Sequence, residues 1–306
     1  MHRTAERILR CIREALPKSW RTCLWLLKII LPISLLVRIL QYSGLLAQVS
    51  PLLEPALSLI GLPGETAIVV ITSIFCPLYA PVAIIPSLGL DLRQATILSL
   101  LCLVAHNLIV ESTVQKRTGS GFWEMTLLRI GMAFLIAFVL HLVMPRSGWS
   151  DMAQASPLAA DSSLWQLLSV WLISSLRVTL TIVVIVTGLM ILHFLLREFP
   201  LMTALARLLS PLMQALGLPR STAFLWMVGN LVGLAYGGAI MIEEARQGKL
   251  SRADANLLNY HLAVSHSLLE DTLIFVAIGI PALWIIPTRL LFAAATVWIR
   301  RALPNK

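Results

Sequence analysis

Two histidines and two carboxylates lie at matching positions in apolar segments of the sequence. His106 and Glu111 occur in LVAHNLIVESTV, and His266 and Asp271 occur in LAVSHSLLEDTL, with the acid five residues after the histidine in both. An imidazole beside a carboxylate can relay a proton, hydrogen-bond a polar solute or ligate a metal. Ionisable groups inside a membrane cost about 2.5–3.5 kcal/mol on insertion scales, so their presence indicates a function.

A polar stripe extends this pattern in the second segment. Asn259, His266 and Glu270 are seven and then four residues apart, which places them within about 20° of one line along a continuous helix. We therefore predict a solute-binding or proton-relay site that faces the interior of a helical bundle. The candidate residues are His106, Asn107, Glu111, Asn230, Asn259, His266, Glu270 and Asp271.

Two other interpretations of these residues remain open. Their side chains can instead bond one another, or neighbouring Asn and Ser, and so hold helices together. The spacing matches no standard metal-ligand motif, so we predict no metal and no cofactor. No nucleotide-binding loop, zinc-protease helix or nucleophile elbow occurs, and we do not expect an enzyme.

The composition predicts an integral membrane protein. Of the 306 residues, 58% are hydrophobic and 13% are charged, and the mean hydropathy is +0.84, whereas soluble domains have about 25% charged residues. Apolar stretches of about 20 residues are long enough to cross a bilayer as helices. We predict an all-α polytopic bundle of about eight spans, at residues 22–44, 64–86, 92–115, 122–144, 167–196, 221–242, 253–276 and 281–300.

Shorter segments lie between and before these spans. The basic segment 1–20 carries arginines three or four residues apart and predicts an amphipathic helix on an anionic membrane surface. The Pro-punctuated segments 48–61 and 201–217 are too short to cross alone and predict interfacial or re-entrant helices. The formal charge is +9, but the basic residues form no patch interleaved with aromatic residues. We therefore expect no nucleic-acid partner.

The sequence contains an internal repeat. Half of the twelve positions of LLEPALSLIGLP (52–63) are identical in LLSPLMQALGLP (208–219), at an offset of 156 residues. After a loop the offset becomes 160, which aligns His106 with His266 and Glu111 with Asp271. We predict two homologous units at 21–144 and 164–306, joined by a polar linker at 145–163.

The second span of each unit is interrupted by helix-breaking residues. The first copy contains Pro77, Pro81 and Pro86, and the second contains Asn230 among the glycines at 229, 233, 237 and 238. Interrupted helices at corresponding positions of two halves indicate a transporter binding site. Close helix packing through G-x-x-x-G explains the glycines equally well.

The distribution of basic residues predicts the orientation. With four spans in each unit, one side of the membrane holds 14 Lys and Arg and the other side holds five. The side with 14 contains the N-terminus, the loops at 87–93, 145–163 and 243–252, and the C-terminus. The positive-inside rule then places both termini in the cytoplasm. If the short segment of a unit, at 48–61 or 201–217, actually crosses the membrane, the repeats run in opposite directions instead.

Several short motifs resemble a known family. The segments GLPGETA, LVAHNLIVE, and GLPRSTAFLWMVGN followed by SHSLLEDT resemble bacterial membrane proteins with the nucleoside recognition, or Gate, domain. That domain type also occurs in spore maturation proteins and in the gate regions of nucleoside and ferrous-iron transporters. The resemblance implies a polytopic bundle in the bacterial plasma membrane with a solute-gating role, but it does not establish a nucleoside as ligand.

Two functions are therefore expected. The first is a permease that binds a small polar solute, nucleoside-like or an ion, between the broken second spans and the His/acid third spans. The second is a non-transporting scaffold in the bilayer that docks a membrane partner protein or another copy of itself.

Overall fold

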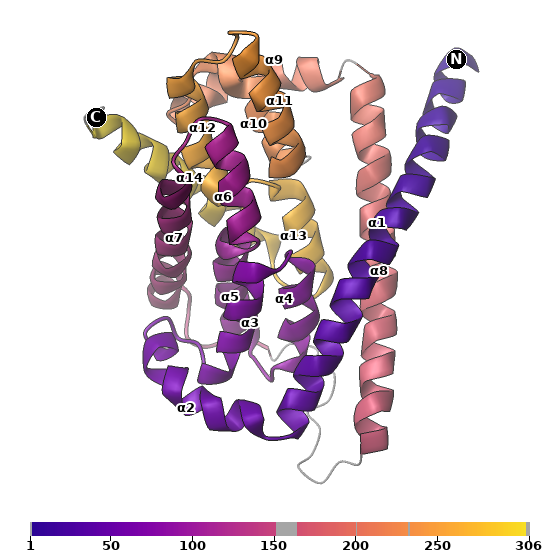
Figure 1. Cartoon of the computed structure of the whole chain (residues 1–306), viewed down its shortest axis with the longest axis vertical. Helices are drawn as coiled ribbons and strands as arrows, with labels where there is room; N and C mark the ends of the chain where they lie inside the picture. The colour runs from indigo at the N-terminus through magenta and orange to yellow at the C-terminus, as the bar shows by residue number, and fades with distance from the viewer. Residues whose placement is uncertain (1, 151–163, 200, 232, 304–306) are drawn as a thin grey trace.

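The computed structural model describes residues 2–150, 164–199, 201–231 and 233–303, which are helical without any strand (Figure 1). The α-helices are α1 (His2–Tyr42), α2 (Leu45–Ser58), α3 (Ala67–Phe75), α4 (Tyr79–Ile84), α5 (Leu92–Ala105), α6 (Leu108–Arg117), α7 (Phe122–Val143), α8 (Leu164–Glu198), α9 (Leu201–Ala215), α10 (Ala223–Leu231), α11 (Leu234–Arg246), α12 (Arg252–Ser265), α13 (Leu268–Ala277) and α14 (Ala282–Ala302). Three short 3-10 helices occupy Gly64–Thr66, Ile85–Ser87 and Arg220–Thr222.

Three described helices are long and apolar enough to cross a membrane. They contain Phe122–Val143, Trp165–Leu192 and Ala282–Ala302, and α5 with α6 passes the same test as a pair bent by 41°. The all-helical membrane fold is therefore confirmed.

The segments 64–86 and 221–242, which the sequence predicts to span, form helical hairpins. The nine-residue α3 runs beside α5 to the middle of the bundle, and α4 returns to the lower end of Figure 1. The nine-residue α10 descends from the upper end, and α11 returns to that end beside α6. Each apolar segment is long enough to cross, but the break at its centre lets the second helix turn back.

Two sets of contacts define the ends of the molecule. At the upper end of Figure 1 the Ser120 hydroxyl donates to Asn256 Oδ1 over 2.6 Å, and the Trp298 indole donates to the Ala215 carbonyl over 3.1 Å. At the lower end the Leu92 amide donates to the Ser150 carbonyl over 3.0 Å. Figure 1 shows the start of α1 and the end of α14 toward the upper end, whereas the loop at 88–91 and residues 145–150 lie at the lower end.

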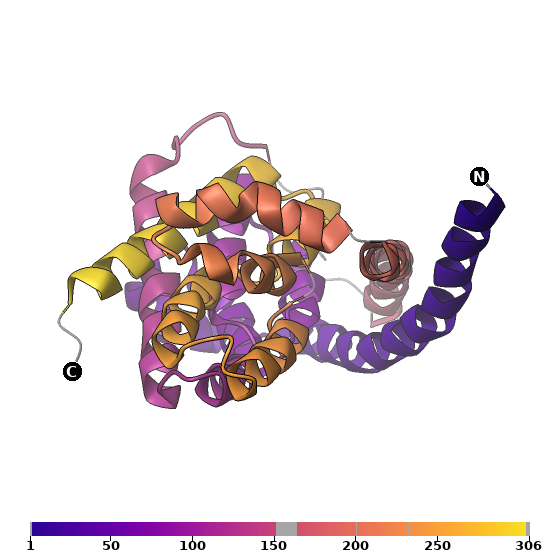
Figure 2. The ribbon, with the colours of Figure 1, turned by 90° about the horizontal axis from the view of Figure 1, so that it is seen from above.

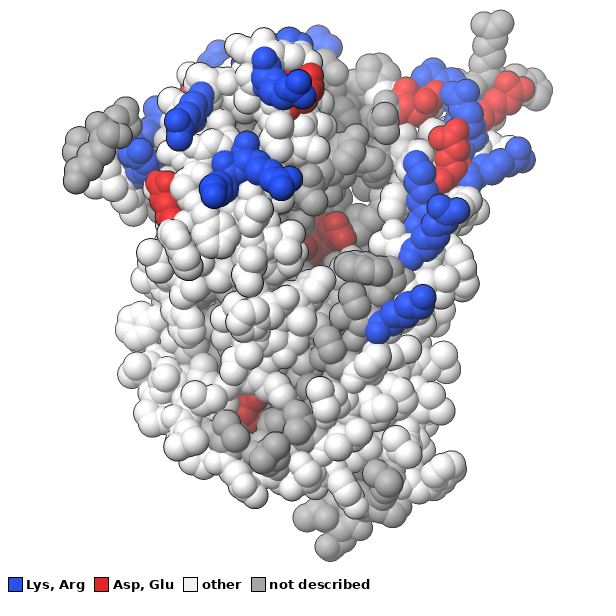
Figure 3. Space-filling model, in the orientation of Figure 1, with Lys and Arg blue, Asp and Glu red and all other residues white. Residues whose placement is uncertain are grey.

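This arrangement corrects the sides assigned to several loops. Figure 3 shows Lys and Arg side chains on the upper part of the molecule and none on its lower part in that view. The sequence scheme had placed 87–93 and 145–163 with the N-terminus, and 116–117 opposite to it. In the structure, 116–117 lie at the upper end and 145–150 at the lower end, while the rest of the linker, 151–163, lies outside the described residues.

The basic segment at the N-terminus is continuous with the first predicted span. It forms the first part of the 41-residue α1, which continues through Pro17. Figures 1 and 2 show α1 beside α8 at the edge of the bundle, with the two helices antiparallel. Arg7 Nε donates to Glu198 Oε1 over 2.8 Å, and farther along the pair Trp171 Nε1 donates to Ser34 Oγ over 3.1 Å.

Candidate functional site

The helical segment that carries each of the two histidines is broken at that histidine. Between α5 and α6, His106 is extended and Asn107 adopts a left-handed conformation with φ of 48°; between α12 and α13, His266 is extended and Ser267 has φ of 51°. These are the described non-glycine residues with positive φ. Such a conformation is uncommon outside glycine, and it persists only where surrounding contacts enforce it.

The tips of the two hairpins supply these contacts. The amide of Asn107 donates to the Ser73 carbonyl over 2.9 Å, at the end of α3. The amide of Ser267 donates to the Gly229 carbonyl over 2.9 Å, in the last turn of α10. Each hairpin therefore satisfies backbone groups that the helix break leaves without partners.

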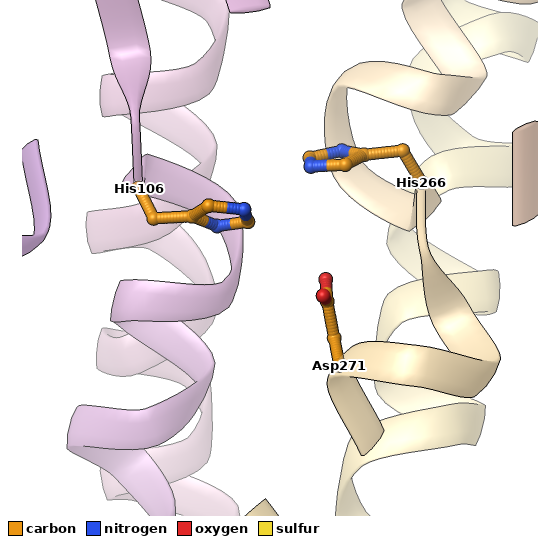
Figure 4. A group of neighbouring side chains, drawn as sticks. All are labelled: His106, His266 and Asp271. Atoms are coloured by element: carbon orange, nitrogen blue, oxygen red, sulfur yellow. The ribbon is translucent and has the colours of Figure 1, made fainter. Parts of the chain in front are cut away.

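The two histidines meet at the centre of the molecule (Figure 4). Their ring centroids are 5.1 Å apart, and Asp271 points toward the space between them. Glu111 from α6 joins the group: its Oε1 lies 3.2 Å from His106 Nε2, and its Oε2 lies 2.9 Å from His266 Nε2. All four side chains are buried.

Two fully buried arginines bind the ends of the broken helices. Arg129 from α7 donates from Nε to the Val104 carbonyl over 2.9 Å and from Nη2 to the His106 carbonyl over 2.8 Å. The same Nη2 lies 2.6 Å from Glu111 Oε2. The guanidinium thus satisfies carbonyls at the end of α5 and neutralises the carboxylate beside them.

Arg289 from α14 repeats this arrangement at the other break. Its Nε donates to the Val264 carbonyl over 2.9 Å, and its Nη2 donates to the His266 carbonyl over 2.6 Å. Its Nη1 lies 3.3 Å from Asp271 Oδ2. Two Arg–carboxylate pairs therefore balance the formal charge at the centre.

The carboxylate of Glu270 lies beside this cluster. It accepts a hydrogen bond from the Tyr79 hydroxyl of α4 over 2.7 Å, so α13 and the first hairpin are connected directly. Figure 3 shows acidic atoms in a recess at mid-height between the bundle and the α1–α8 pair. An acidic group is therefore accessible at mid-height on this face.

The comparisons with known proteins find one family model and one membrane-protein relative. Residues 23–115 match the family model described as Gate, nucleoside recognition. The chain is also 34% identical over 271 residues to the uncharacterized membrane protein YvoD of Bacillus subtilis strain 168. This alignment covers 87% of the chain and 86% of the relative.

This chain belongs to the Gate family. No solved structure matches the Gate protein described here. The family resemblance drawn from the short sequence motifs is thereby confirmed, and the matched region contains the first hairpin and the first broken helix except its last two residues.

The Gate protein brings together four of the eight candidate site residues: His106, Glu111, His266 and Asp271. Asn107 forms the first break, and Glu270 lies at the edge of the cluster. Asn230 lies buried in α10, where its Nδ2 donates to the Trp226 carbonyl over 2.9 Å and its Oδ1 has no hydrogen-bond partner among the described residues.

Asn259 does not belong to the central cluster. Its Nδ2 donates to Thr118 Oγ1 and to Ser120 Oγ, both over 2.9 Å, at the upper end of the molecule. The predicted stripe through Asn259, His266 and Glu270 requires a continuous helix, but the break at 266–267 separates α12 from α13. Asn259 instead connects α12 to Thr118 and Ser120, in the loop between α6 and α7.

The sequence analysis missed the roles of Arg129 and Arg289. Basic residues in apolar segments are usually interpreted as reaching toward the membrane surface, but both of these guanidiniums are fully buried. The signal was the offset of 160, which aligns Arg129 with Arg289 as it aligns the two histidines.

A metal ion could reach some of these groups. One ligand atom each from His106, His266 and Asp271 lies within 4.8 Å of the others. However, Arg289 is paired with Asp271 and Arg129 with Glu111, and these guanidiniums oppose a further divalent charge. We therefore do not assign a metal to this cluster.

Proposed function

We propose that this Gate protein is a permease of the bacterial plasma membrane that binds a small polar solute between the two broken helices. The central cluster offers imidazole, carboxylate and guanidinium groups away from both ends of the molecule. Buried polar groups at the centre of a membrane protein mark the paths of solutes and ions. The family description makes nucleosides the first solutes to test.

The proposal includes an inverted repeat of two homologous units. In its support, α3 and α10 are both nine residues long and both end at the centre, but they approach from opposite ends. The Arg129 and Arg289 contacts repeat with the same donor atoms. Inverted repeats with broken helices at their interface allow alternating access to a fixed site.

The proposed topology has six crossings and two re-entrant hairpins. The crossings are α1, α5 with α6, α7, α8, α12 with α13, and α14. The upper end has many exposed basic residues in loops and helix ends, whereas the lower end has Arg93 and Arg146 among the described residues. The positive-inside rule then favours a cytoplasmic location for the upper end and both termini.

The observation that carries the proposal is the meeting of His106 and His266 at two matched helix breaks. Interhelical hydrogen bonds alone do not require both helices to break at the same depth, or each break to be supported by a hairpin tip. Breaks of this kind free backbone groups and dipole ends for a ligand.

A thermal-shift screen of the purified protein tests the proposal. The panel contains nucleosides, nucleobases, amino acids and divalent metal ions. A ligand at a hundred times its Kd raises the apparent stability by about 2.7 kcal/mol. We expect at least one class of compound to raise the melting temperature of the wild-type protein.

The double variant H106Q/H266Q should lose this shift. The matched control is H141Q, because His141 lies at the lower end of α7, outside the cluster. If no compound in the panel shifts the wild type, or if H106Q/H266Q responds as the wild type does, the permease proposal fails. The first outcome favours the scaffold function.

A further inference from the structure

The hydrogen bonds of the two central histidines determine which nitrogen carries the proton. His106 Nδ1 lies 3.2 Å from the Cys102 carbonyl and 3.1 Å from the Leu103 carbonyl. His266 Nδ1 lies 2.8 Å from the Leu262 carbonyl. A carbonyl oxygen only accepts hydrogen bonds, so both Nδ1 atoms carry hydrogen, and each neutral ring presents a lone pair at Nε2.

Both lone pairs point to the same carboxylate. Glu111 Oε1 is 3.2 Å from His106 Nε2, and Glu111 Oε2 is 2.9 Å from His266 Nε2. An ionised carboxylate is also only an acceptor, so two neutral imidazoles would face it without a hydrogen between them. His266 Nε2 and Glu111 Oε2 also lack a well-aligned hydrogen bond within the described part of the chain. Burying such acceptors together is costly.

The surrounding charges limit how many protons relieve this contact. Arg129 of α7 already pairs with Glu111, and Arg289 of α14 pairs with Asp271 of α13. Glu270 of α13 and Tyr79 of α4 bond each other at the edge of the cluster. Protonating both imidazoles would gather three cations around Glu111. One added proton turns one acceptor–acceptor contact into a hydrogen-bonded contact without this repulsion.

We propose that His106, Glu111 and His266 form a binding site for one exchangeable proton, which couples solute transport to the proton gradient. The coupling rests on the proposed permease function, whereas the proton site does not. The protein takes one proton from water, and no other bond changes. Because each imidazole lies at the break of a different unit, the shared proton links the two units at the centre.

Nitrogen-15 NMR of the histidine-labelled protein in detergent micelles tests the site directly. H106Q and H266Q assign the two resonances. We expect both rings to retain hydrogen at Nδ1, and one proton to be gained at Nε2 or at Glu111 as the pH falls from about 8 to about 5. In E111Q this titration of the paired rings should disappear, because the amide donates to one Nε2 and cannot ionise.

The control variant is E243Q, which removes an exposed carboxylate at the upper end of α11. It should leave the histidine titration unchanged. Wild-type rings that stay neutral, beside a carboxylate that stays ionised across this range, would overturn the proton site. This result does not use E111Q, so it stands even if that variant does not fold.

Proteoliposomes test the coupling with nucleosides as the probe. If one proton moves with each solute, an inward gradient of one pH unit should raise solute accumulation by the wild type by up to about tenfold. Any exchange of labelled nucleoside that E111Q retains should not respond to the gradient, whereas E243Q should keep the wild-type gradient dependence. If the wild type accumulates nucleoside independently of the gradient, the coupling is contradicted but the permease proposal stands. If the wild type neither exchanges nor binds nucleoside, the permease proposal is contradicted.

Discussion

At the scale of single residues, the two buried arginines explain how helices can stop in the middle of this molecule. A helix end leaves carbonyl groups without partners, and in a membrane no bulk water is present to satisfy them. Arg129 satisfies the carbonyls of Val104 and His106, and its charge is balanced by Glu111. Arg289 does the same at the second break.

Replacing Arg129 should therefore be strongly destabilising. R129A leaves Glu111 as a buried charge without its cation and leaves two carbonyls without donors, which together cost about 3–5 kcal/mol. Thermal unfolding in detergent measures the effect. R117A is the control, because Arg117 is exposed at the end of α6 and its loss should change stability by less than about 0.5 kcal/mol. Equal melting temperatures for the two variants would contradict this role of Arg129.

Part of the site could be predicted from residue types and spacing. His106, Glu111, His266 and Asp271 stand out because ionisable groups are rare in apolar segments and recur at one offset. The helix breaks could not be predicted, because neither glycine nor proline marks them. They depend on tertiary contacts, such as the bond from the Asn107 amide to the Ser73 carbonyl. Asn259 was misplaced for the same reason.

At the scale of elements, the α10–α11 hairpin depends on glycine. Gly233 has φ of 97° at the start of α11, so it makes the turn that a side chain would strain. Gly237 lies against Gly229, and a Cβ on Gly237 would lie 3.1 Å from Gly229 Cα. The glycines therefore do what both explanations of the sequence require: Gly233 interrupts the helix, and Gly229 and Gly237 allow close packing.

G237A should loosen this hairpin. The added methyl group meets backbone rather than a flexible side chain, and overpacking of this kind costs about 1–3 kcal/mol. G131A is the matched control, because a Cβ on Gly131 in α7 meets nothing within 4 Å. We expect G131A to melt at or slightly above the wild-type temperature, since alanine favours helices. A melting temperature for G237A as high as that of G131A would disprove the close contact.

The α1–α8 pair should respond to acid at its upper end. The Arg7 hydrogen bond lowers the pKa of Glu198 below its ordinary value of 4.5. Because the folded protein lowers this pKa, the contact stabilises the fold above pH 4.5 and is lost as the pH falls through the lowered value. Melting temperatures of the wild type and E198Q should therefore differ slightly at neutral pH and converge in acid. A difference that grows in acid would contradict this contact.

The hairpins also show where hydropathy fails as a guide. An apolar segment of about 20 residues satisfies the length requirement for crossing whether or not it turns back. The prediction of eight spans is not confirmed for this reason, because 64–86 and 221–242 each contain two short helices.

At the scale of the whole molecule, the two hairpins place residues that the sequence scheme assigned to one side at opposite ends of the molecule. The predicted scheme of four spans per unit placed residues 145–150 with the N-terminus, but they lie at the opposite end. The corrected arrangement gathers the basic residues at one end more completely than the sequence scheme did. The charge pattern was therefore informative, whereas the side assigned to each loop depended on the number of crossings assumed.

Thiol labelling in intact cells tests this topology. Single cysteines are introduced as R117C, Q247C or R146C into a protein whose native cysteines at 11, 23, 76 and 102 are replaced by serine. All three positions are exposed. A membrane-impermeant reagent should label R146C from outside and should reach R117C and Q247C after the cells are opened. Labelling of R117C but not R146C in intact cells would support the four-span scheme instead.

The central claim is that a polar solute crosses through the paired helix breaks. Uptake of labelled nucleosides, and of any other compound that shifts the melting temperature, into proteoliposomes tests it most directly. Wild type and H141Q should accumulate or exchange solute, whereas H106Q/H266Q should insert and fold but lose at least nine-tenths of the rate, a loss of about 1.4 kcal/mol in barrier terms. Uptake by H106Q/H266Q at the wild-type rate would contradict the claim.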